Sequence, residues 1–307
     1  MSRAPVNMGA SVRNRLTARA RAQREDAQRL MIRYVIERLL YRLGRSPHRG
    51  LFVLKGAMLF SLWSPTPYRA TGDLDLLGYG DNAPDQLMSV FREIMAMAVE
   101  DDGVVFHPES LRVTPAREAD EYSGARLDFT ATLAGARMTI HVDIGYGDAV
   151  TPGVVRIEYP TLLDLPAPSL LAYPPETVVA EKYQAMVSLG MVNTRMKDFF
   201  DLWAIAGTFA FDGAVLARAI QATFERRRTA LPRELPVALT AGFAADKQVQ
   251  WRAFLARTHI ALAPEPFDDV QARIATLVMA PTMALLAGQT FVLHWEPDGS
   301  WSVRSLT

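Results

Sequence analysis

The stretch RATGDLDLL, from Arg69 to Leu77, places two aspartates, Asp73 and Asp75, two positions apart within a run of leucines. Alternation of this kind is typical of a β-strand, in which residues i and i+2 project from the same side. We therefore expect both carboxylates on one face of a strand. Two neighbouring carboxylates repel each other unless positive charge lies close to them. The stretch thus predicts a cation beside the two aspartates.

The composition is that of an ordinary globular protein, with 307 residues, 50% of them apolar and 21% charged. This length suffices for one large domain or two modest ones. The sequence has no cysteine, which excludes disulfides, thiolate zinc sites and cysteine nucleophiles and agrees with a reducing, cytoplasmic compartment. We expect neither a signal peptide nor a membrane span, because no long apolar run occurs.

A net charge of zero hides an uneven distribution of charge along the chain. Residues 1–49 carry twelve arginines against three acids, so this segment is strongly basic and the remainder is acidic. A basic N-terminal arm on an acidic body indicates a polyanionic partner such as nucleic acid. The alternative interpretation is a solvated helix surface.

The pattern of apolar residues predicts an α/β protein with a small mixed sheet and two lobes. Leucines at helical spacing predict one helix over 11–44, and residues 51–63 and 73–80 contain strands. The proline-rich segment 160–175 is the expected linker. We therefore expect an N-terminal lobe over 1–159 and a mostly helical C-terminal lobe over 160–307 that ends in a β-hairpin.

A hairpin is also expected between ARLDFTATL and RMTIHVDIGYG, whose apolar residues alternate with polar ones. A four-residue loop at 134–137 would pair Leu133 with Met138 and place Asp128 opposite Asp143. Asp143 would then lie on the polar face of its strand.

Three carboxylates from neighbouring strands could hold magnesium, which prefers hard oxygen ligands and keeps water and substrate phosphates as its remaining ligands. Asp73 and Asp75 would supply two of these ligands, Asp143 the third, and Asp128 a weaker fourth. A pair of such ions can stabilise both the attacking and the leaving oxygen of a phosphoryl displacement. The alternative is a polar strand edge, since D-x-D alone is a weak signal.

The segment KGAM, Lys55 to Met58, precedes the aspartates at a strand-to-helix junction. A glycine there lets backbone N–H groups approach a triphosphate. No P-loop, H-E-x-x-H or G-x-S-x-G motif occurs, which argues against P-loop, zinc-peptidase and serine-hydrolase chemistry.

Together, the segments VLKGAMLFSLW, RATGDLDLLG, HVDIGYGDAV, AEKYQAMVSLG and NTRMKDFFDLWAI resemble the AbiEii/AbiGii toxin family over about residues 12–206. Members of that family are nucleotidyltransferases of type IV toxin–antitoxin and abortive-infection systems, within the DNA polymerase β-like superfamily. The resemblance implies a polymerase β-like nucleotidyltransferase core, a nucleoside triphosphate substrate, Mg²⁺ and a separately encoded antitoxin.

The resemblance also implies roles for individual residues. Asp73 and Asp75 would be the metal-binding pair, and Gly56 the glycine of the first motif. Lys182 would hold the phosphates of the nucleotide, and Asp198 would be the aspartate of the second half, with Asp201 one turn later. The expected nucleotide-binding residues are Gly56, Ala57, Thr71 and Lys182. Ala57 departs from the family, which often has serine or glycine there, so a hydroxyl contact to phosphate is missing.

Without the resemblance, the residues of the second half of the chain also allow purely structural roles for Lys182 and Asp198. A lysine on a largely apolar helix, such as Lys182, usually extends its ammonium group to water. Asp198 could be a first-turn acid favoured by the helix dipole.

The expected reaction is nucleotidyl transfer from a triphosphate to an acceptor hydroxyl, with Asp143 helping to deprotonate the attacking group. The resemblance points to RNA, the 3′ end of tRNA in some members, and to loss of translation. A protein or small-molecule acceptor is one alternative. A catalytically silent binding protein is the other.

Overall fold

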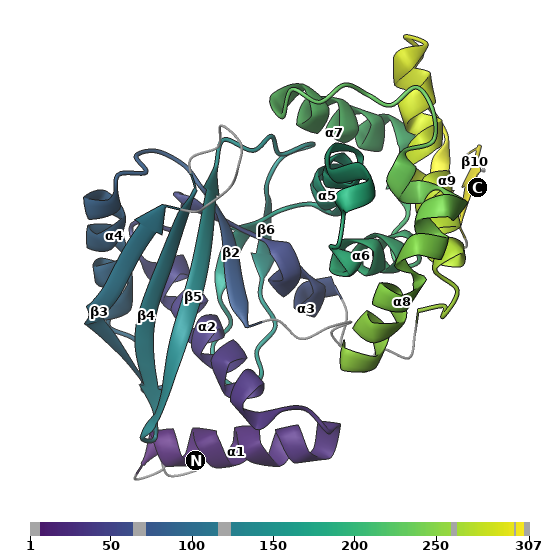
Figure 1. Cartoon of the computed structure of the whole chain (residues 1–307). Helices are drawn as coiled ribbons and strands as arrows, with labels where there is room; N and C mark the ends of the chain where they lie inside the picture. The colour runs from purple at the N-terminus through teal and green to yellow at the C-terminus, as the bar shows by residue number, and fades with distance from the viewer. Residues whose placement is uncertain (1–6, 64–71, 116–123, 259–262, 298, 304–307) are drawn as a thin grey trace. The chain divides into compact units, whose positions relative to one another are not determined.

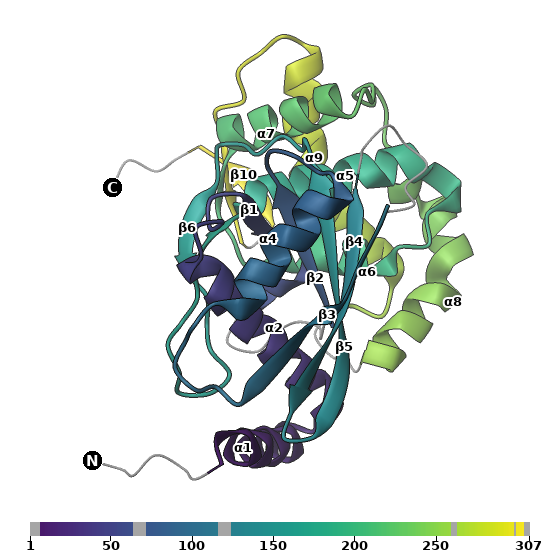
Figure 2. The ribbon, with the colours of Figure 1, turned by 90° about the vertical axis from the view of Figure 1, so that its left-hand side faces the viewer.

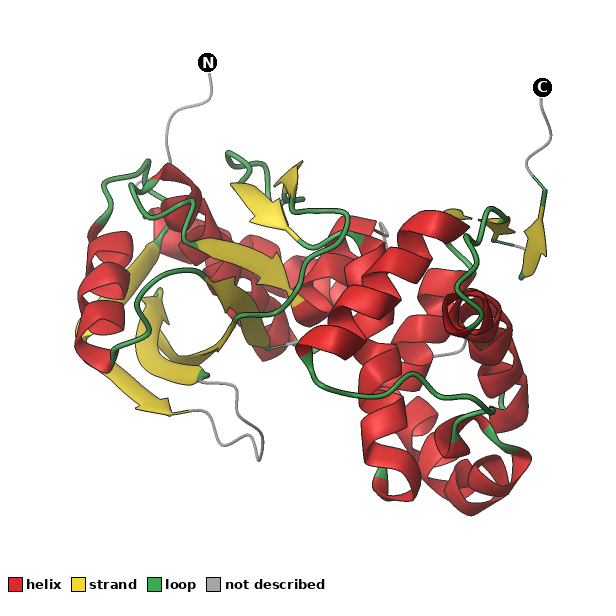
Figure 3. Cartoon of the chain, turned by 90° about the horizontal axis from the view of Figure 1, so that it is seen from above, coloured by secondary structure: helices red, strands yellow, loops and turns green. Residues whose placement is uncertain are grey.

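The structure, a computed structural model, describes residues 7–63, 72–115, 124–258, 263–297 and 299–303. The chain divides into two compact units, one of Met1–Gly147 with Val155–Ala172 and the other of Asp148–Val154 with Tyr173–Thr307. The first contains a large sheet, and the second is mostly helical (Figure 3). The expected boundary between residues 159 and 160 falls inside the first unit.

The first unit is built around one mixed sheet (Figure 1). Its strands are β1 (Phe52–Lys55), β2 (Asp73–Gly78), β3 (Val104–Pro115), β4 (Ala125–Leu133), β5 (Ala136–Tyr146), β6 (Val155–Glu158) and β7 (Ser169–Ala172). They lie in the order β3-β4-β5-β2-β1-β7-β6. Strand β2 pairs parallel with β5 and antiparallel with β1. The prediction of an α/β fold with a mixed sheet is confirmed, and β7 comes from the segment expected to be a linker.

Helices α2 (Ala27–Arg45) and α4 (Pro84–Ala96) lie against one face of this sheet (Figure 2). That face is apolar because the strands alternate, and its side chains are buried, as Phe129, Ile140 and Leu76 illustrate. Phe52 of β1 packs edge-on against Phe91 of α4, with 5.4 Å between ring centroids. The opposite face of β4, β5 and β2 carries the polar residues of the same strands.

The single helix expected over 11–44 is wrong, because the chain forms α1 (Met8–Gln23) and α2 with a break between them. Arg24 adopts a left-handed conformation (φ 55°), and the N–H of Glu25 donates to the carbonyl of Ala20. Asp26 then caps α2 by accepting a hydrogen bond from the N–H of Arg29 at 2.7 Å. These capping bonds outweigh the continuous helical spacing of the leucines.

The hairpin of β4 and β5 forms, but its expected register is wrong by two residues. Leu133 pairs with Ala136, and Arg126 rather than Asp128 lies opposite Asp143. Ala134 and Gly135 both have positive φ (46° and 79°), as a two-residue type I′ turn requires. A shift of two residues keeps every side chain on its expected face, so the polar and apolar faces agree with the prediction.

Part of the basic charge of the N-terminal segment is internal. Arg38 and Arg42 of α2 are buried, and Arg42 donates to both carboxylate oxygens of Asp102, at 2.6 and 3.2 Å. Arg38 donates to Glu37 at 2.7 Å. The exposed arginines described in this segment lie on α1 and in the turn that follows it, at positions 13, 15, 21 and 24, and on or after α2, at positions 29, 45 and 49.

The second unit consists of helices around an aromatic core, with a small sheet. Its helices are α5 (Pro175–Leu189), α6 (Met196–Ala206), α7 (Gly213–Arg226), α8 (Ala241–Thr258) and α9 (Phe267–Leu286), with 3-10 turns η2 (Gly190–Val192) and η3 (Val237–Leu239). The ring of Trp251 stacks on Phe267 at 5.0 Å. The predicted C-terminal hairpin is confirmed as β9 (His294–Glu296) and β10 (Ser300–Ser302), and β8 (Phe211–Asp212) extends it. Within the ranges described, no helix has the length and apolar character needed to cross a bilayer.

Glu37 should make the stability of the protein depend on pH. Burial raises the pKa of this carboxyl to about 7, although Arg38 and the N–H of Leu162 favour its charged form. A pKa raised in the folded state gives stability that is complete below the ordinary value of 4.5 and is lost as pH rises through about 7. The pKa difference corresponds to about 3 kcal/mol.

We expect the Glu37→Gln variant to lack this loss of stability. The free energy of unfolding should be measured by denaturant titration across pH 4.5 to 7 for the wild type, Glu37→Gln and the exposed-site control Glu158→Gln. If the free energy of unfolding changed with pH equally in the wild type and in Glu37→Gln, the raised pKa of Glu37 would not be the cause of the loss.

Candidate active site

The polar face of the sheet brings the predicted acids together. Asp73 and Asp75 lie on β2, where Asp73 is exposed and Asp75 half-buried. In the parallel pairing with β5, Asp75 is the partner of Asp143, and Asp73 is the partner of His141. Because paired residues project from the same face, the three aspartates expected from the sequence share one small area of the sheet.

Arginine and lysine side chains accompany these acids. The Nε atom of Arg126 lies 3.4 Å from Asp143 Oδ1 and 3.9 Å from Asp128 Oδ1. Lys55 of β1 is the cross-strand partner of Asp75. The sequence interpretation assigned neither residue a role. The shorter turn of the hairpin would have revealed Arg126, because it sets the register that places this residue opposite Asp143.

One further pairing and the burial of Asp143 define the electrostatics of this face. Nδ1 of His141 lies 2.5 Å from Asp128 Oδ1. Burial raises the pKa of Asp143, an effect that Arg126 opposes and the charge of Asp73 reinforces. Asp143 is therefore a carboxylate whose negative charge is costly in the absence of a further cation.

Gly56 is packed directly against the D-x-D pair. It begins the 3-10 turn η1 (Gly56–Met58), ahead of α3 (Leu59–Trp63), with φ at +70°. A Cβ atom at this position would lie 2.0 Å from Asp75 Oδ2, so only glycine fits without moving the carboxylate. Ala57, which follows, is buried. Thr71 lies outside the described residues.

The donor set on this face suits a hard divalent cation. All three aspartates offer carboxylate oxygens, and the missing side chain of Gly56 leaves room for the carboxylate of Asp75. In the parts of the chain that the structure describes, no three His, Cys, Asp or Glu side chains are already arranged to enclose a metal ion. Magnesium, however, commonly takes only one or two protein carboxylates and completes its octahedron with water and phosphate oxygens. The residues therefore fit the ion.

A second charged cluster lies in the helical unit. Lys182 Nζ on α5 is 2.6 Å from Asp198 Oδ1 and 2.9 Å from Asp201 Oδ2, both on α6. The side chain of Lys182 is 14% exposed, and those of Asp198 and Asp201 are 1% and 0% exposed. Arg195 Nε lies 2.6 Å from the other oxygen of Asp198. Lys182 therefore holds two buried carboxylates rather than only extending to water.

A half-buried charged network that the sequence interpretation missed includes Glu181, the residue before Lys182. Arg227 contacts Asp148 Oδ1 at 3.1 Å and Glu181 Oε1 at 3.3 Å, and it donates to Gln184 at 3.0 Å. Burial and the two nearby carboxylates raise the pKa of Tyr173 far above its ordinary value. Glu181 precedes Lys182 on α5, so the network helps to fix the helix that carries the lysine.

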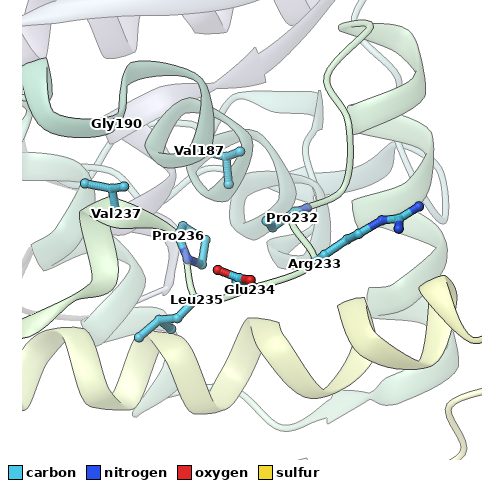
Figure 4. A pocket seen from close by; sticks show the side chains of 8 residues that line it. All are labelled: Val187, Gly190, Pro232, Arg233, Glu234, Leu235, Pro236 and Val237. Atoms are coloured by element: carbon cyan, nitrogen blue, oxygen red, sulfur yellow. The ribbon is translucent and has the colours of Figure 1, made fainter.

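The helical unit also has an open pocket of about 410 Å³ (Figure 4). Val187 and Gly190 line it from one side, and residues 232–237 line it from the other. Arg233 and Glu234 are the charged residues of its lining, which contains none of the site residues expected from the sequence.

Solved structures with weak similarity to this chain come from Helicobacter pylori. A search of the curated proteins finds no match. JHP933 from Helicobacter pylori is a solved structure with 15% identity and a TM-score of 0.49, over 85% of this chain and 98% of its own. A candidate nucleotidyltransferase from H. pylori has 14% identity and a TM-score of 0.48, over 87% and 100%.

The family comparison covers most of the chain. The model of the nucleotidyl transferase AbiEii toxins of type IV toxin–antitoxin systems matches residues 38–273. The matched range includes the strands that carry Asp73, Asp75 and Asp143 and the helices that carry Lys182 and Asp198. The chain therefore belongs to the AbiEii nucleotidyltransferase toxin family.

Proposed function

We propose that this nucleotidyltransferase moves a nucleoside monophosphate from a triphosphate to a hydroxyl of RNA, with the 3′ end of tRNA as acceptor. The observation that carries the proposal is the group of three aspartates on one sheet face beside Gly56, in a chain of this family. Blocking tRNA in this way would stop translation in the cytoplasm. The family also implies a separate antitoxin.

Asp73, Asp75 and Asp143 would hold Mg²⁺ in the proposed site. When bound, the ion neutralises charge on the phosphates and helps to activate the attacking hydroxyl. The residues of the chain position the reactants. Gly56 lets the backbone approach the triphosphate, and Arg126 compensates the charge of Asp143 before the ion binds. Asp143 is suited to accept the proton of the acceptor hydroxyl, since burial raises its pKa.

Lys182 is proposed to contact the phosphates of the nucleotide, with Asp198 and Asp201 as the carboxylates that orient its ammonium group. Their contacts at 2.6 and 2.9 Å support this, because a lysine held at two points has a defined direction. Ala57 offers no hydroxyl to a phosphate.

The exposed arginines of α1 support RNA as acceptor, since Arg13, Arg15 and Arg21 form a solvent-facing basic surface on one helix. Contacts from such a surface go mainly to phosphates and carry no sequence information. The arm therefore favours a nucleic acid without selecting a sequence.

The test is an incubation of the purified protein with Mg²⁺, total tRNA and each of the four α-³²P-labelled triphosphates. We expect label on tRNA from one or two nucleotides, and none with an Asp75→Asn variant. Label on protein or on a small molecule instead would show that the acceptor is not RNA. No transfer to any acceptor, and no binding of triphosphate with Mg²⁺, would show that the chain is a silent binding protein.

Gly56→Ala is expected to reduce nucleotidyl transfer by at least about tenfold, because the added methyl group displaces the Asp75 carboxylate. The left-handed backbone adds strain of roughly 1–2 kcal/mol. Gly80→Ala is the matched control, since Gly80 also has positive φ (+89°) but a Cβ atom added there would have no neighbour within 4 Å. Initial rates of transfer and thermal unfolding should be measured for both. Equal rates in the two variants would contradict a role for the close approach at Gly56.

A further inference from the structure

The first unit contains a small pocket, and none of the proposed catalytic residues is part of its lining. It has a volume of about 140 Å³ and lies between α1, α2, the segment that follows Gly56, and residues 159–162. Arg19 of α1 and Arg33 of α2 line it, together with the hydroxyl-bearing residues Ser61 and Tyr159. The lining is therefore rich in hydrogen-bond donors.

Arg33 is buried, yet its guanidinium group makes only long contacts with Ser61 and Glu25. The residue is 7% exposed. Its guanidinium group lies 3.5 Å from Ser61 Oγ and 3.6 Å from Glu25 Oε2, whereas a charge-assisted hydrogen bond is ordinarily about 2.7–2.9 Å long. A guanidinium group offers five N–H donors. Arg33 therefore retains capacity for an anionic ligand.

The acid in the lining does not cancel this charge. One oxygen of Glu37 accepts a hydrogen bond from Arg38 at 2.7 Å, and the other accepts one from the N–H of Leu162 at 2.7 Å. Arg19 donates through NH1 to the carbonyl of Leu162 and through Nε to Gln23, and neither acceptor is charged. The lining therefore holds two arginines and one acid, and both oxygens of that acid accept hydrogen bonds from other groups.

The size of the pocket limits its ligand. Pockets that enclose a whole drug-sized molecule usually have volumes of about 300–1,000 Å³, well above the 140 Å³ found here. A tetrahedral phosphate group is small enough to enter a pocket of this volume. Arg15 lies four residues before Arg19 on α1, so it shares the same side of the helix, and it is exposed.

We propose that the pocket lined by Arg19 and Arg33 binds one phosphate of the RNA acceptor, with the exposed Arg15 beside it contacting a further phosphate. The choice of RNA rests on the proposed function, whereas the preference for a phosphate rests on the pocket itself. Because Arg19 and Arg33 lie outside the D-x-D face, they act in binding the acceptor and not in the transfer step.

The test is equilibrium binding of fluorescent tRNA to the full-length protein, without triphosphate or Mg²⁺, over a series of salt concentrations. We expect Arg19→Gln and Arg33→Gln each to weaken binding by about three- to tenfold and to lower the salt slope by about 1. Arg33→Lys keeps the charge and should preserve the slope. Arg257→Gln removes one exposed charge from α8 and is the control. The proposal is overturned if folded Arg19→Gln, checked by circular dichroism, matches Arg257→Gln in affinity and slope.

A second measurement separates RNA from free phosphate as the source of the ligand. Inorganic phosphate should raise the melting temperature of the wild type above that in chloride of equal ionic strength, and Arg19→Gln should remove this increase. A phosphate effect that depends on Arg19, combined with unchanged RNA affinity, would assign the pocket to free phosphate and overturn the RNA proposal.

The two proposals can fail separately. RNA binding that depends on Arg19 without label transfer to tRNA would retain the pocket and refute the proposed function. Label transfer to tRNA, together with unaltered tRNA binding by Arg19→Gln, would support the proposed function and refute the phosphate pocket.

Discussion

Replacing Asp75 with asparagine is expected to reduce nucleotidyl transfer by roughly a thousandfold or more while the protein stays folded. The carboxylate lies on the polar face of β2, paired with Asp143 across the parallel strands. Losing one hard ligand removes several kcal/mol of charge stabilisation from the transition state, and each 1.4 kcal/mol corresponds to about tenfold in rate. Asparagine has nearly the same shape, so the close packing of Gly56 on this side chain is kept.

The rate of label transfer should be measured for Asp75→Asn beside Asp85→Asn, which changes an exposed acid in the first turn of α4. Binding of Mn²⁺, followed by electron paramagnetic resonance, gives a readout independent of activity and should weaken only in the Asp75 variant. A variant that bound Mn²⁺ as tightly as the wild type would show that Asp75 is not a metal ligand.

Replacing Lys182 with methionine is expected to destabilise the helical unit by roughly 3–5 kcal/mol, the usual cost of removing one partner from a buried ion pair. Asp198 and Asp201 would lose their shared cation, and both side chains are almost fully buried. Arg195 remains beside Asp198 only, through the oxygen that does not contact Lys182. The free energy of unfolding from denaturant titration measures the effect, and Lys197→Met, at an exposed position of α6, is the control.

A triple variant separates the structural role of Lys182 from its proposed role in binding phosphate. Neutralising all three groups, as Lys182→Met with Asp198→Asn and Asp201→Asn, removes the uncompensated charges and should restore much of the lost stability. Transfer should stay absent in this variant if the lysine contacts the nucleotide. Recovery of transfer together with stability would limit Lys182 to a structural role.

The faces of the strands could be predicted from the sequence because side-chain direction in a strand is a local property with a period of two. Asp73 and Asp75 had to share a face wherever the strand lay, and Asp143 had to lie on the polar face of its hairpin. The shift of register by two residues left these assignments intact. The helices carrying Lys182 and Asp198 could be recognised for a similar reason, since helical spacing is also local.

The partners of these charges could not be predicted in the same way. Arg126 came opposite Asp143 only because Ala134 and Gly135 form a two-residue turn, and turn length is not fixed by the alternation of the strands. Arg38 and Arg42 were expected on a basic arm, but burial on α2 made them internal counter-ions. The break at Arg24 depended on capping bonds that compete with helix continuation.

The sequence by itself thus determined on which strand face or helix each residue of the candidate site lies. These placements follow from the side-chain periods of two residues in a strand and 3.6 residues in a helix. Only the tertiary structure decided which charges meet. Lys182 is held by Asp198 and Asp201, Asp143 is paired with Arg126, and Gly56 lies against Asp75. Electrostatic and packing energies depend on distances through space between segments far apart in sequence, and no local pattern encodes those distances.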